Sequence, residues 1–331
     1  MDGLAHAMDG RLRSSWLQLG KEEEMKRGIL LAIVIGLACL PLVVSGFQGP
    51  SAAALAATKI ERVKDNLYVI TGSGVADQNA FSGGNTAVFV TDSGVIVVDT
   101  KLPGWGPTLL ERIKTVTNKP ITTIINTHTH GDHTGSNEFF GTTVDSVVHE
   151  NTKANMAKMN EFKGDKAKFL PKRTYKDKLT IGKGKDEVDL YYFGPGHTSG
   201  DSFVVFPALR TMHVGDMFAW KALPYIDTGN GGSAVGHAST LAKAVATVKD
   251  VDTIIPGHIP VTTWNDFKEY ADFSQDFVTF ARNETKAGKT VDQAVAEYKV
   301  PAKFKGYVVS VNDQFGSAPA NLKAAYDELK K

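Results

Sequence analysis

The feature that most constrains this chain is a run of six residues, 128–133, with the sequence HTHGDH. It holds three imidazoles and one carboxylate, which are the side-chain groups that bind transition metals. A β-branched run at 121–126 precedes it and is typical of a buried strand. Ionisable groups this close together repel one another on protonation unless they share a partner. The run therefore predicts a metal site where a strand opens into a loop.

Other metal-ligand residues also follow predicted strands. His197, Asp216 and His258 each come within a few residues of the end of an apolar run, and each has a glycine beside it. Glycine lets the backbone approach a ligand closely. This pattern predicts one site assembled from several strand ends. Of two further histidines, His149 is interpreted as a surface imidazole and His213 as structural.

The composition excludes some classes of partner and ligand. The chain has 37 Lys and Arg against 36 Asp and Glu, so it offers no electrostatic case for binding nucleic acid. The single cysteine, Cys39, lies in an apolar N-terminal run. If that run is removed, any metal site must be built from nitrogen and oxygen donors.

The N-terminal part resembles a secretory signal. Lys26 and Arg27 precede an apolar run over 28–46, and small residues follow it. We expect an exported protein, periplasmic or secreted, and the alternative is an uncleaved N-terminal membrane anchor. Met25 is a candidate for the true start of translation.

Strands and helices are mixed along the rest of the chain. Strands are predicted at 67–70, 86–90, 95–99, 121–126, 143–148, 188–193, 202–206, 210–214 and 253–255. Helices are predicted from Pro107 and at 150–162, 240–248, 264–285 and 321–331. The predicted organisation is an N-terminal extension over 1–57, a catalytic domain over 58–286 and a C-terminal helical appendage over 287–331.

The order of the motifs resembles that of the metallo-β-lactamase superfamily. HTHGDH at 128–133 is followed by Gly-His-Thr at 196–198, Gly-Asp at 215–216 and Pro-Gly-His at 256–258. Asp99, at the end of a predicted strand, matches an aspartate that braces the histidine loop in that family. The resemblance covers residues 59–270. It implies an α+β fold, the αββα sandwich, with the metal site at one edge between two sheets.

The resemblance also implies a ligand set for two Zn²⁺ ions per chain, with iron or manganese as alternative metals. His128, His130 and His197 would hold the first metal, Asp132, His133 and His258 the second, and Asp216 would bridge them. Asp99, Thr198 and Asp201 would orient the ligands from behind, although a loop-capping role for Thr198 and Asp201 is an equal alternative.

The expected reaction is hydrolysis of an ester, thioester or lactone by a metal-bridging hydroxide, which Asp132 would orient. Asp216 stands where the true β-lactamases of the superfamily have cysteine or serine, and where thioesterases of the glyoxalase II kind and lactonases have aspartate. β-Lactam hydrolysis is therefore the runner-up. The glutathione-binding basic motif of glyoxalase II is not found.

Two glycine-rich loops, 71–85 and 217–236, are expected to line the pocket for a small-molecule acyl substrate. The candidate wall residues are Phe81, Phe218, Trp220, Tyr225 and His237. The alternative interpretation is that these aromatic residues anchor the loops to the core. Two other functions stay open: a persulfide dioxygenase with a single iron, and an exported metal-binding protein without catalysis. The oligomeric state is not predicted.

Overall fold

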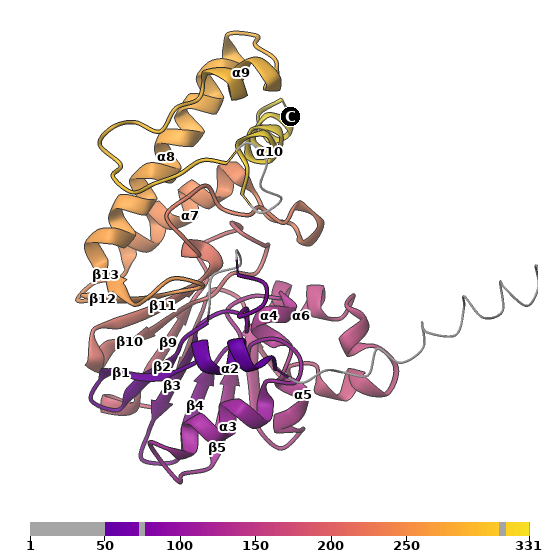
Figure 1. The fold of residues 1–331 in the computed structure, drawn as a ribbon, viewed down its shortest axis with the longest axis vertical. Coiled ribbons are helices and arrows are strands. Elements are labelled where there is room, and N and C mark those ends of the chain that lie inside the picture. Colours follow the sequence, from indigo (N-terminus) through magenta and orange to yellow (C-terminus); the bar gives the residue numbers. More distant parts are fainter. Residues whose placement is uncertain (1–49, 73–76, 311–315, 331) are drawn as a thin grey trace, which may run out of the picture. The chain divides into compact units, whose positions relative to one another are not determined.

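Two β-sheets organise the residues that the computed structural model describes, which are 50–72, 77–310 and 316–330 (Figure 1). The first sheet has the order β1 (Ile60–Lys64), β2 (Leu67–Ile70), β3 (Thr86–Val90), β4 (Val95–Val98), β5 (Ile121–Ile125), β6 (Asp145–His149) and β7 (Arg173–Tyr175). The second has the order β13 (Thr262–Thr263), β12 (Thr253–Pro256), β11 (Thr211–Gly215), β10 (Phe203–Phe206), β9 (Val188–Tyr191) and β8 (Lys178–Ile181).

Helices cover the outer faces of both sheets. The α-helices that come before β11 in the chain are α2 (Ala52–Ala57), α3 (Gly106–Lys114), α4 (Gly131–Thr134), α5 (Asn137–Phe140) and α6 (Glu150–Met156). Those after β11 are α7 (Ala234–Thr247), α8 (Trp264–Lys286), α9 (Val291–Glu297) and α10 (Ala318–Leu329). Figure 1 shows α7, α8 and α10 grouped beyond β11 to β13, and α3 beside β4 and β5.

Alternation along the strands produces the layers. Phe89 and Val98 of the first sheet lie in one buried cluster with Phe206 of the second sheet. Their neighbours Val88 and Val97 instead pack with Leu109 of α3. Successive side chains of a strand point to opposite faces, so one strand serves both layers. The result is the expected α+β fold, an αββα sandwich.

The C-terminal helices share a core with the second sheet. Leu322 and Tyr326 of α10 lie in the same buried cluster as Leu241 of α7, Phe267 of α8 and Met212 of β11. The boundaries drawn at residues 57 and 286 stay predictions.

Several elements differ from the expected ones. Strands β1, β7 and β8 were not predicted, because their short runs carry charged residues and show little apolar alternation. Helix α7 begins at Ala234, six residues before the expected start, because Ser233 caps its first turn by accepting from the Gly236 amide. The apolar run 28–46, Cys39 and the start proposed at Met25 lie outside the described residues. Within the described part, we find no helix with both the length and the apolar character needed to cross a membrane.

The sheet topology brings distant motifs to one edge. Strands β4 and β5 are parallel, with Val98 beside Ile125, so the residues that follow them emerge together. Strands β11 and β12 are also parallel, with Gly215 beside Pro256. Parallel neighbours end at the same edge, which is where the histidine loops meet.

Candidate metal centre

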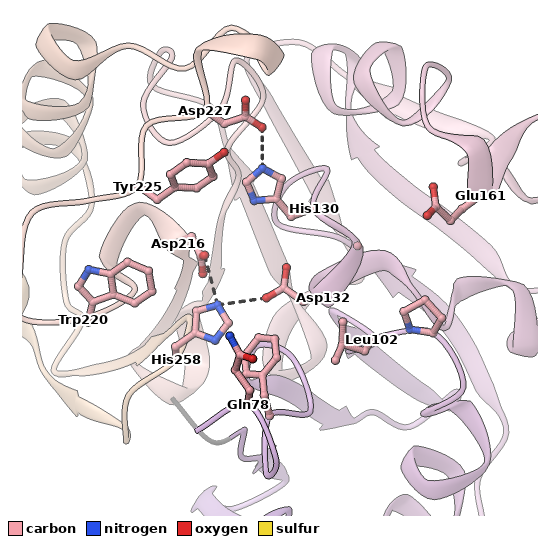
Figure 2. A pocket seen from close by; sticks show the side chains of 13 residues that line it. Gln78, Leu102, His130, Asp132, Glu161, Asp216, Trp220, Tyr225, Asp227 and His258 are labelled. Atoms are coloured by element: carbon pink, nitrogen blue, oxygen red, sulfur yellow. Dashed lines mark hydrogen bonds and ion pairs between the residues drawn. The ribbon is translucent and has the colours of Figure 1, made fainter. Parts of the chain in front are cut away.

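Four connections at this edge carry the seven expected ligands. The loop after β5 supplies His128 and His130, and the short helix α4 that follows supplies Asp132 and His133. The other three are His197 in the turn between β9 and β10, Asp216 directly after β11, and His258 two residues after β12. Figure 2 shows His130, Asp132, Asp216 and His258 facing a common space.

His128, His130 and His197 form what we call the three-histidine group. Their ligand nitrogens all lie within 4.8 Å of one another. His197 Nε2 is 2.9 Å from His130 Nδ1. His128 is buried, and its Nε2 atom makes no hydrogen bond to any described residue. A buried nitrogen without a partner is costly, and a bound cation would satisfy it.

Asp132, His133 and His258 form what we call the mixed group. His258 Nε2 lies 3.3 Å from the Asp132 carboxylate and 3.4 Å from His133 Nε2. His133 Nε2 lies 3.5 Å from the same carboxylate. Two imidazoles and one carboxylate aimed at one point are a ligand set that suits a divalent metal.

Asp216 lies between the two groups. Its Oδ2 atom is 3.2 Å from His258 Nε2 and 3.7 Å from His197 Nε2, and its Oδ1 atom is 3.3 Å from His133 Nε2. Gly257 makes this approach possible, because a Cβ atom there would clash with Asp216 Oδ1. One carboxylate thus reaches both groups, as a bridging ligand must.

Hydrogen bonds on the outer side orient several of these rings. Asp99 accepts from the His133 Nδ1 atom at 2.7 Å and from the Thr127 amide at 2.8 Å. The Tyr225 carbonyl accepts from His197 Nδ1 at 2.6 Å. When the outward nitrogen donates, the inward nitrogen of a neutral ring keeps its lone pair for a metal.

Asp227 is a functional candidate that the sequence analysis missed. Its Oδ2 atom lies 2.8 Å from His130 Nε2, which leaves His130 Nδ1 facing the centre. Asn230 donates to the same carboxylate. These hydrogen bonds outweigh burial and lower the pKa of Asp227 below its usual range. Asp227 sits in a glycine-rich loop 97 residues away from His130, and no local pattern marks it.

Lys101 is a second residue that local patterns did not reveal. Its side chain is fully buried behind the histidine loop, where Nζ donates to the carbonyls of Thr71 and Gly84 at 2.8 and 2.9 Å. Burial lowers its pKa to about 7. Lys101 thus joins the 71–85 loop to the chain that follows Asp99.

Thr198 and Asp201 brace the turn that carries His197. Asp201 accepts from the Thr198 amide at 2.8 Å and from the Thr198 hydroxyl at 2.7 Å. These bonds close the turn after His197, so the contacts match the loop-capping alternative. Burial raises the pKa of Asp201 to about 7.

His213 and His149 lie outside both groups, and both are buried. The structural interpretation of His213 thus fits, whereas the surface position predicted for His149 is wrong. His213 accepts from the Gly215 amide through Nδ1 and contacts the Asn85 carbonyl through Nε2. His149 stacks on Tyr192 with ring centroids 3.8 Å apart. Both rings have their partners within the fold.

A cavity of about 740 Å³ opens over the ligands. Its walls comprise Gln78, Phe81, Leu102, Pro103, His130, Gly131, Asp132, Glu161, Asp216, Trp220, Tyr225, Asp227 and His258. Three of the expected wall residues, Phe81, Trp220 and Tyr225, are among them.

Two expected wall residues lie elsewhere. Phe218 is buried and stacks on Tyr270 with ring centroids 4.3 Å apart. His237 is buried in α7 with its ring 5.8 Å from that of Tyr270. Both point into the core beneath the second sheet, because the helical phase of α7 and the one-turn helix after β11 turn them away from the cavity.

A comparison with known families matches residues 80–258 to the metallo-beta-lactamase superfamily. The chain belongs to this superfamily. Its members are metal-dependent hydrolases, and the matched segment contains all seven candidate ligands.

Individual relatives have different activities. The metallo-beta-lactamase type 2 of Elizabethkingia meningoseptica is 31% identical over 195 residues, which are 55% of this chain and 69% of that protein. The structure of the inverting sec-alkylsulfatase Pisa1 from Pseudomonas sp. has a TM-score of 0.65 at 16% identity, covering 83% of this chain and 51% of that one. This chain thus spans about half of the alkylsulfatase. The DIM-1 metallo-beta-lactamase structure has a TM-score of 0.55 at 19% identity, covering 66% and 97%. At these identities the two structures establish the fold alone.

Proposed function

We propose that this protein is a hydrolase with two zinc ions per chain that cleaves an ester, thioester or lactone. The observation that carries the proposal is the position of Asp216, whose carboxylate lies within 3.7 Å of histidines from both ligand groups. The donors are imidazoles and carboxylates only, which suit Zn²⁺ at neutral pH. Two bound cations would lower the pKa of water to about 7 and offset charge on the carbonyl oxygen.

The residues of the chain then have distinct roles. His128, His130 and His197 would hold one cation, Asp132, His133 and His258 the other, and Asp216 both. Asp132 also lines the cavity, and the imidazoles beside it lower its pKa to about 2 even though burial opposes this. It is ionised at neutral pH, so it can accept a hydrogen bond from the attacking water and orient it. Asp227 and Asp99 hold the rings of His130 and His133 in position.

The residue at position 216 is the basis for proposing which kind of bond is cleaved. An aspartate at position 216 resembles the thioesterase and lactonase branches of the superfamily rather than the true β-lactamases. The similarity to a metallo-beta-lactamase over 69% of that protein keeps lactam hydrolysis as the second candidate. A mononuclear iron dioxygenase and a metal-binding protein without catalysis would use the same ligands.

Metal analysis and a substrate panel test the proposal. The purified protein should contain close to two zinc ions per chain, and a single iron would favour the dioxygenase. Hydrolysis of aryl esters, thioesters, lactones and a chromogenic cephalosporin should then be measured with the wild-type protein and with His130→Ala. His149→Asn is the matched control, because it alters a histidine outside both groups. If no substrate of the panel is hydrolysed in a metal-dependent way, the metal-binding protein without catalysis becomes the favoured alternative.

Export is a separate proposal, supported by the basic pair and the apolar run at 28–46. Fractionation of the native host, with N-terminal sequencing of the mature protein, tests it. A mature chain that begins near residue 58 in the exported fraction is the expected result. An intact run in the membrane fraction would indicate the anchored alternative.

A further inference from the structure

We infer that the cavity selects substrates that carry no negative charge outside the bond that is cleaved. This inference deepens the proposed function and rests on it for the reaction. The class that fits is a neutral ester, thioester or lactone with an aromatic or aliphatic body. Three observations on the cavity carry the inference: its apolar walls, the lack of cationic side chains in its described lining, and the carboxylates that line it.

Apolar groups flank the metal centre on two sides. The ring of Phe81 lies 5.7 Å and that of Trp220 lies 6.0 Å from the ring of His258. The ring of Tyr225 lies 5.8 Å from that of His130. Figure 2 shows Trp220 and Tyr225 on the same side of the cavity, with Leu102 across from them. A flat apolar body would be held between these walls next to the reacting bond.

Among the described residues, no lysine or arginine lines the cavity. The lysines that neighbour wall residues in the chain have other partners. Lys101 is buried and donates to backbone carbonyls, and Lys221 pairs with Asp266 at 2.9 Å. On either side of Glu161, Lys158 donates to Asn155 at 2.9 Å and Lys163 donates to Asn160 at 3.0 Å. The two internal segments that are not described, 73–76 and 311–315, contain no lysine or arginine in their sequence. Apart from the proposed metal ions, an anionic substrate group therefore meets no cationic side chain among the described lining residues.

Carboxylates also line the cavity. Glu161 and Asp227 both line the cavity in addition to the ligands Asp132 and Asp216. The Asp227 side chain is only 14% exposed, and His130 and Asn230 both donate to its carboxylate. Glu161 is exposed in the 3₁₀ turn Asn160–Phe162. Like charges at short range disfavour binding, most strongly where water is excluded.

This charge pattern separates the protein from its relatives in substrate. Penicillins and cephalosporins carry a carboxylate outside the bond that is cleaved. A cavity lined by acidic residues and, in its described part, by no cationic side chain is poorly suited to hold that carboxylate. The shared fold therefore does not carry the relatives' substrates over to this chain.

A matched pair of esters tests the inference on the zinc-loaded full-length protein. p-Nitrophenyl butyrate and p-nitrophenyl hemisuccinate share a leaving group and have acyl chains of similar length, but only the second carries a carboxylate. We expect kcat/KM to be about 10-fold or more higher for the neutral ester, with a smaller ratio at high salt. Equal values, or a preference for the hemisuccinate, would overturn the inference.

Variants of Glu161, which lines the cavity, test whether the preference for the neutral ester arises there. Glu161→Lys should raise kcat/KM for the hemisuccinate several-fold and leave the butyrate nearly unchanged, and Glu161→Gln should give a smaller shift in the same direction. Asp165→Lys is the matched control, because Asp165 is exposed nearby and does not line the cavity. An equal gain in Asp165→Lys would assign the effect to net charge and contradict a local role for the cavity.

A binding measurement separates this inference from the proposed reaction. Calorimetry on the zinc-loaded protein would compare 4-methylbenzenethiol with 4-mercaptobenzoate, which differ by one carboxylate. Tighter binding of the neutral thiol supports the inference even if no ester is hydrolysed, and in that case only the proposed reaction fails. Equal binding of the two thiols, or binding of neither, counts against the inference.

Discussion

The three-histidine group and the mixed group differ in the charge that each carries before a metal arrives. Burial and the neighbouring imidazoles lower the pKa of His197 to about 4, and burial lowers the pKa of His128 as well. In the mixed group, burial opposes protonation, but Asp216 and Asp132 outweigh it and raise the pKa of His258 to about 9. The same carboxylates raise the pKa of His133.

The two groups are also supported differently. His130 and His197 each donate an outward hydrogen bond, to Asp227 and to the Tyr225 carbonyl. His258 Nδ1 makes no hydrogen bond to a described residue, and its ring lies instead beside those of Phe81 and Trp220. His128 and His197 are therefore neutral at pH 7, whereas a cation entering the mixed group must displace protons. Two unequal metal affinities follow.

The largest expected effect comes from removing one ligand of each group. His197→Ala should abolish tight binding at the three-histidine group and lower kcat/KM by more than about 100-fold, which exceeds the usual effect of an outer partner. His258→Ala should lose the weaker metal instead. Zinc titration with a chromogenic chelator measures both variants. If they lose metals of the same affinity, the two groups are not distinct.

The next effect concerns the outer carboxylates. Asp227→Asn removes the charged partner of His130 and should weaken the tighter zinc about 10- to 100-fold. Asp99→Asn removes the partner of His133 and should act on the weaker zinc by a similar factor. Zinc titration against a chromogenic chelator measures both variants, and each variant is the control for the other. A uniform loss at both metals in either variant would indicate a general distortion of the site.

A pH dependence follows for the chelator-treated protein. The folded-state pKa of His258, about 9, lies above its reference value of 6.5. Its contribution to the free energy of unfolding is therefore fully present below pH 6.5 and is lost as the pH rises through 9, by about 3 kcal/mol. Urea unfolding at pH 6.5 and 9.5 measures this loss. Comparing wild type with His258→Gln separates the contribution of His258 from that of other groups. An equal change in the free energy of unfolding between the two pH values in both proteins would contradict the prediction.

The smallest effect concerns the support of the loop that carries Tyr225 and Asp227. The Glu328 carboxylate accepts from the Ala234 amide at 2.7 Å, just after that loop, and Ser233 donates to it. Glu328→Gln should lower the free energy of unfolding by about 1 kcal/mol and weaken only the tighter zinc, by less than about 10-fold. Asp327→Asn, on the same helix, is the control in thermal unfolding. Equal losses in both variants would argue against a specific role for Glu328.

Much of the site could be predicted because its parts are short and local. His128 to His133 lie in one run, and His197, Asp216 and His258 each follow an apolar strand. Strands with a continuous apolar pattern, such as β3, β4 and β5, were predicted within one or two residues. A strand end next to a glycine is visible in the sequence, and parallel pairing then places such ends side by side.

The residues that were missed or misplaced depend on distant partners. Asp227 gains its role from His130, Lys101 from the loop before β3, and neither contact leaves a periodic trace. Phe218 and His237 lie next to the pocket in sequence but point into the core, since helix phase decides where each points.

The sequence by itself therefore determined the chemistry: the nitrogen and oxygen donors, their order and their place after buried strands. The tertiary structure decided which donor faces which, how each ring is held, and what lines the cavity. The physical reason is that ligand type is a property of single residues, whereas orientation, charge coupling and burial arise only when segments about a hundred residues apart pack together.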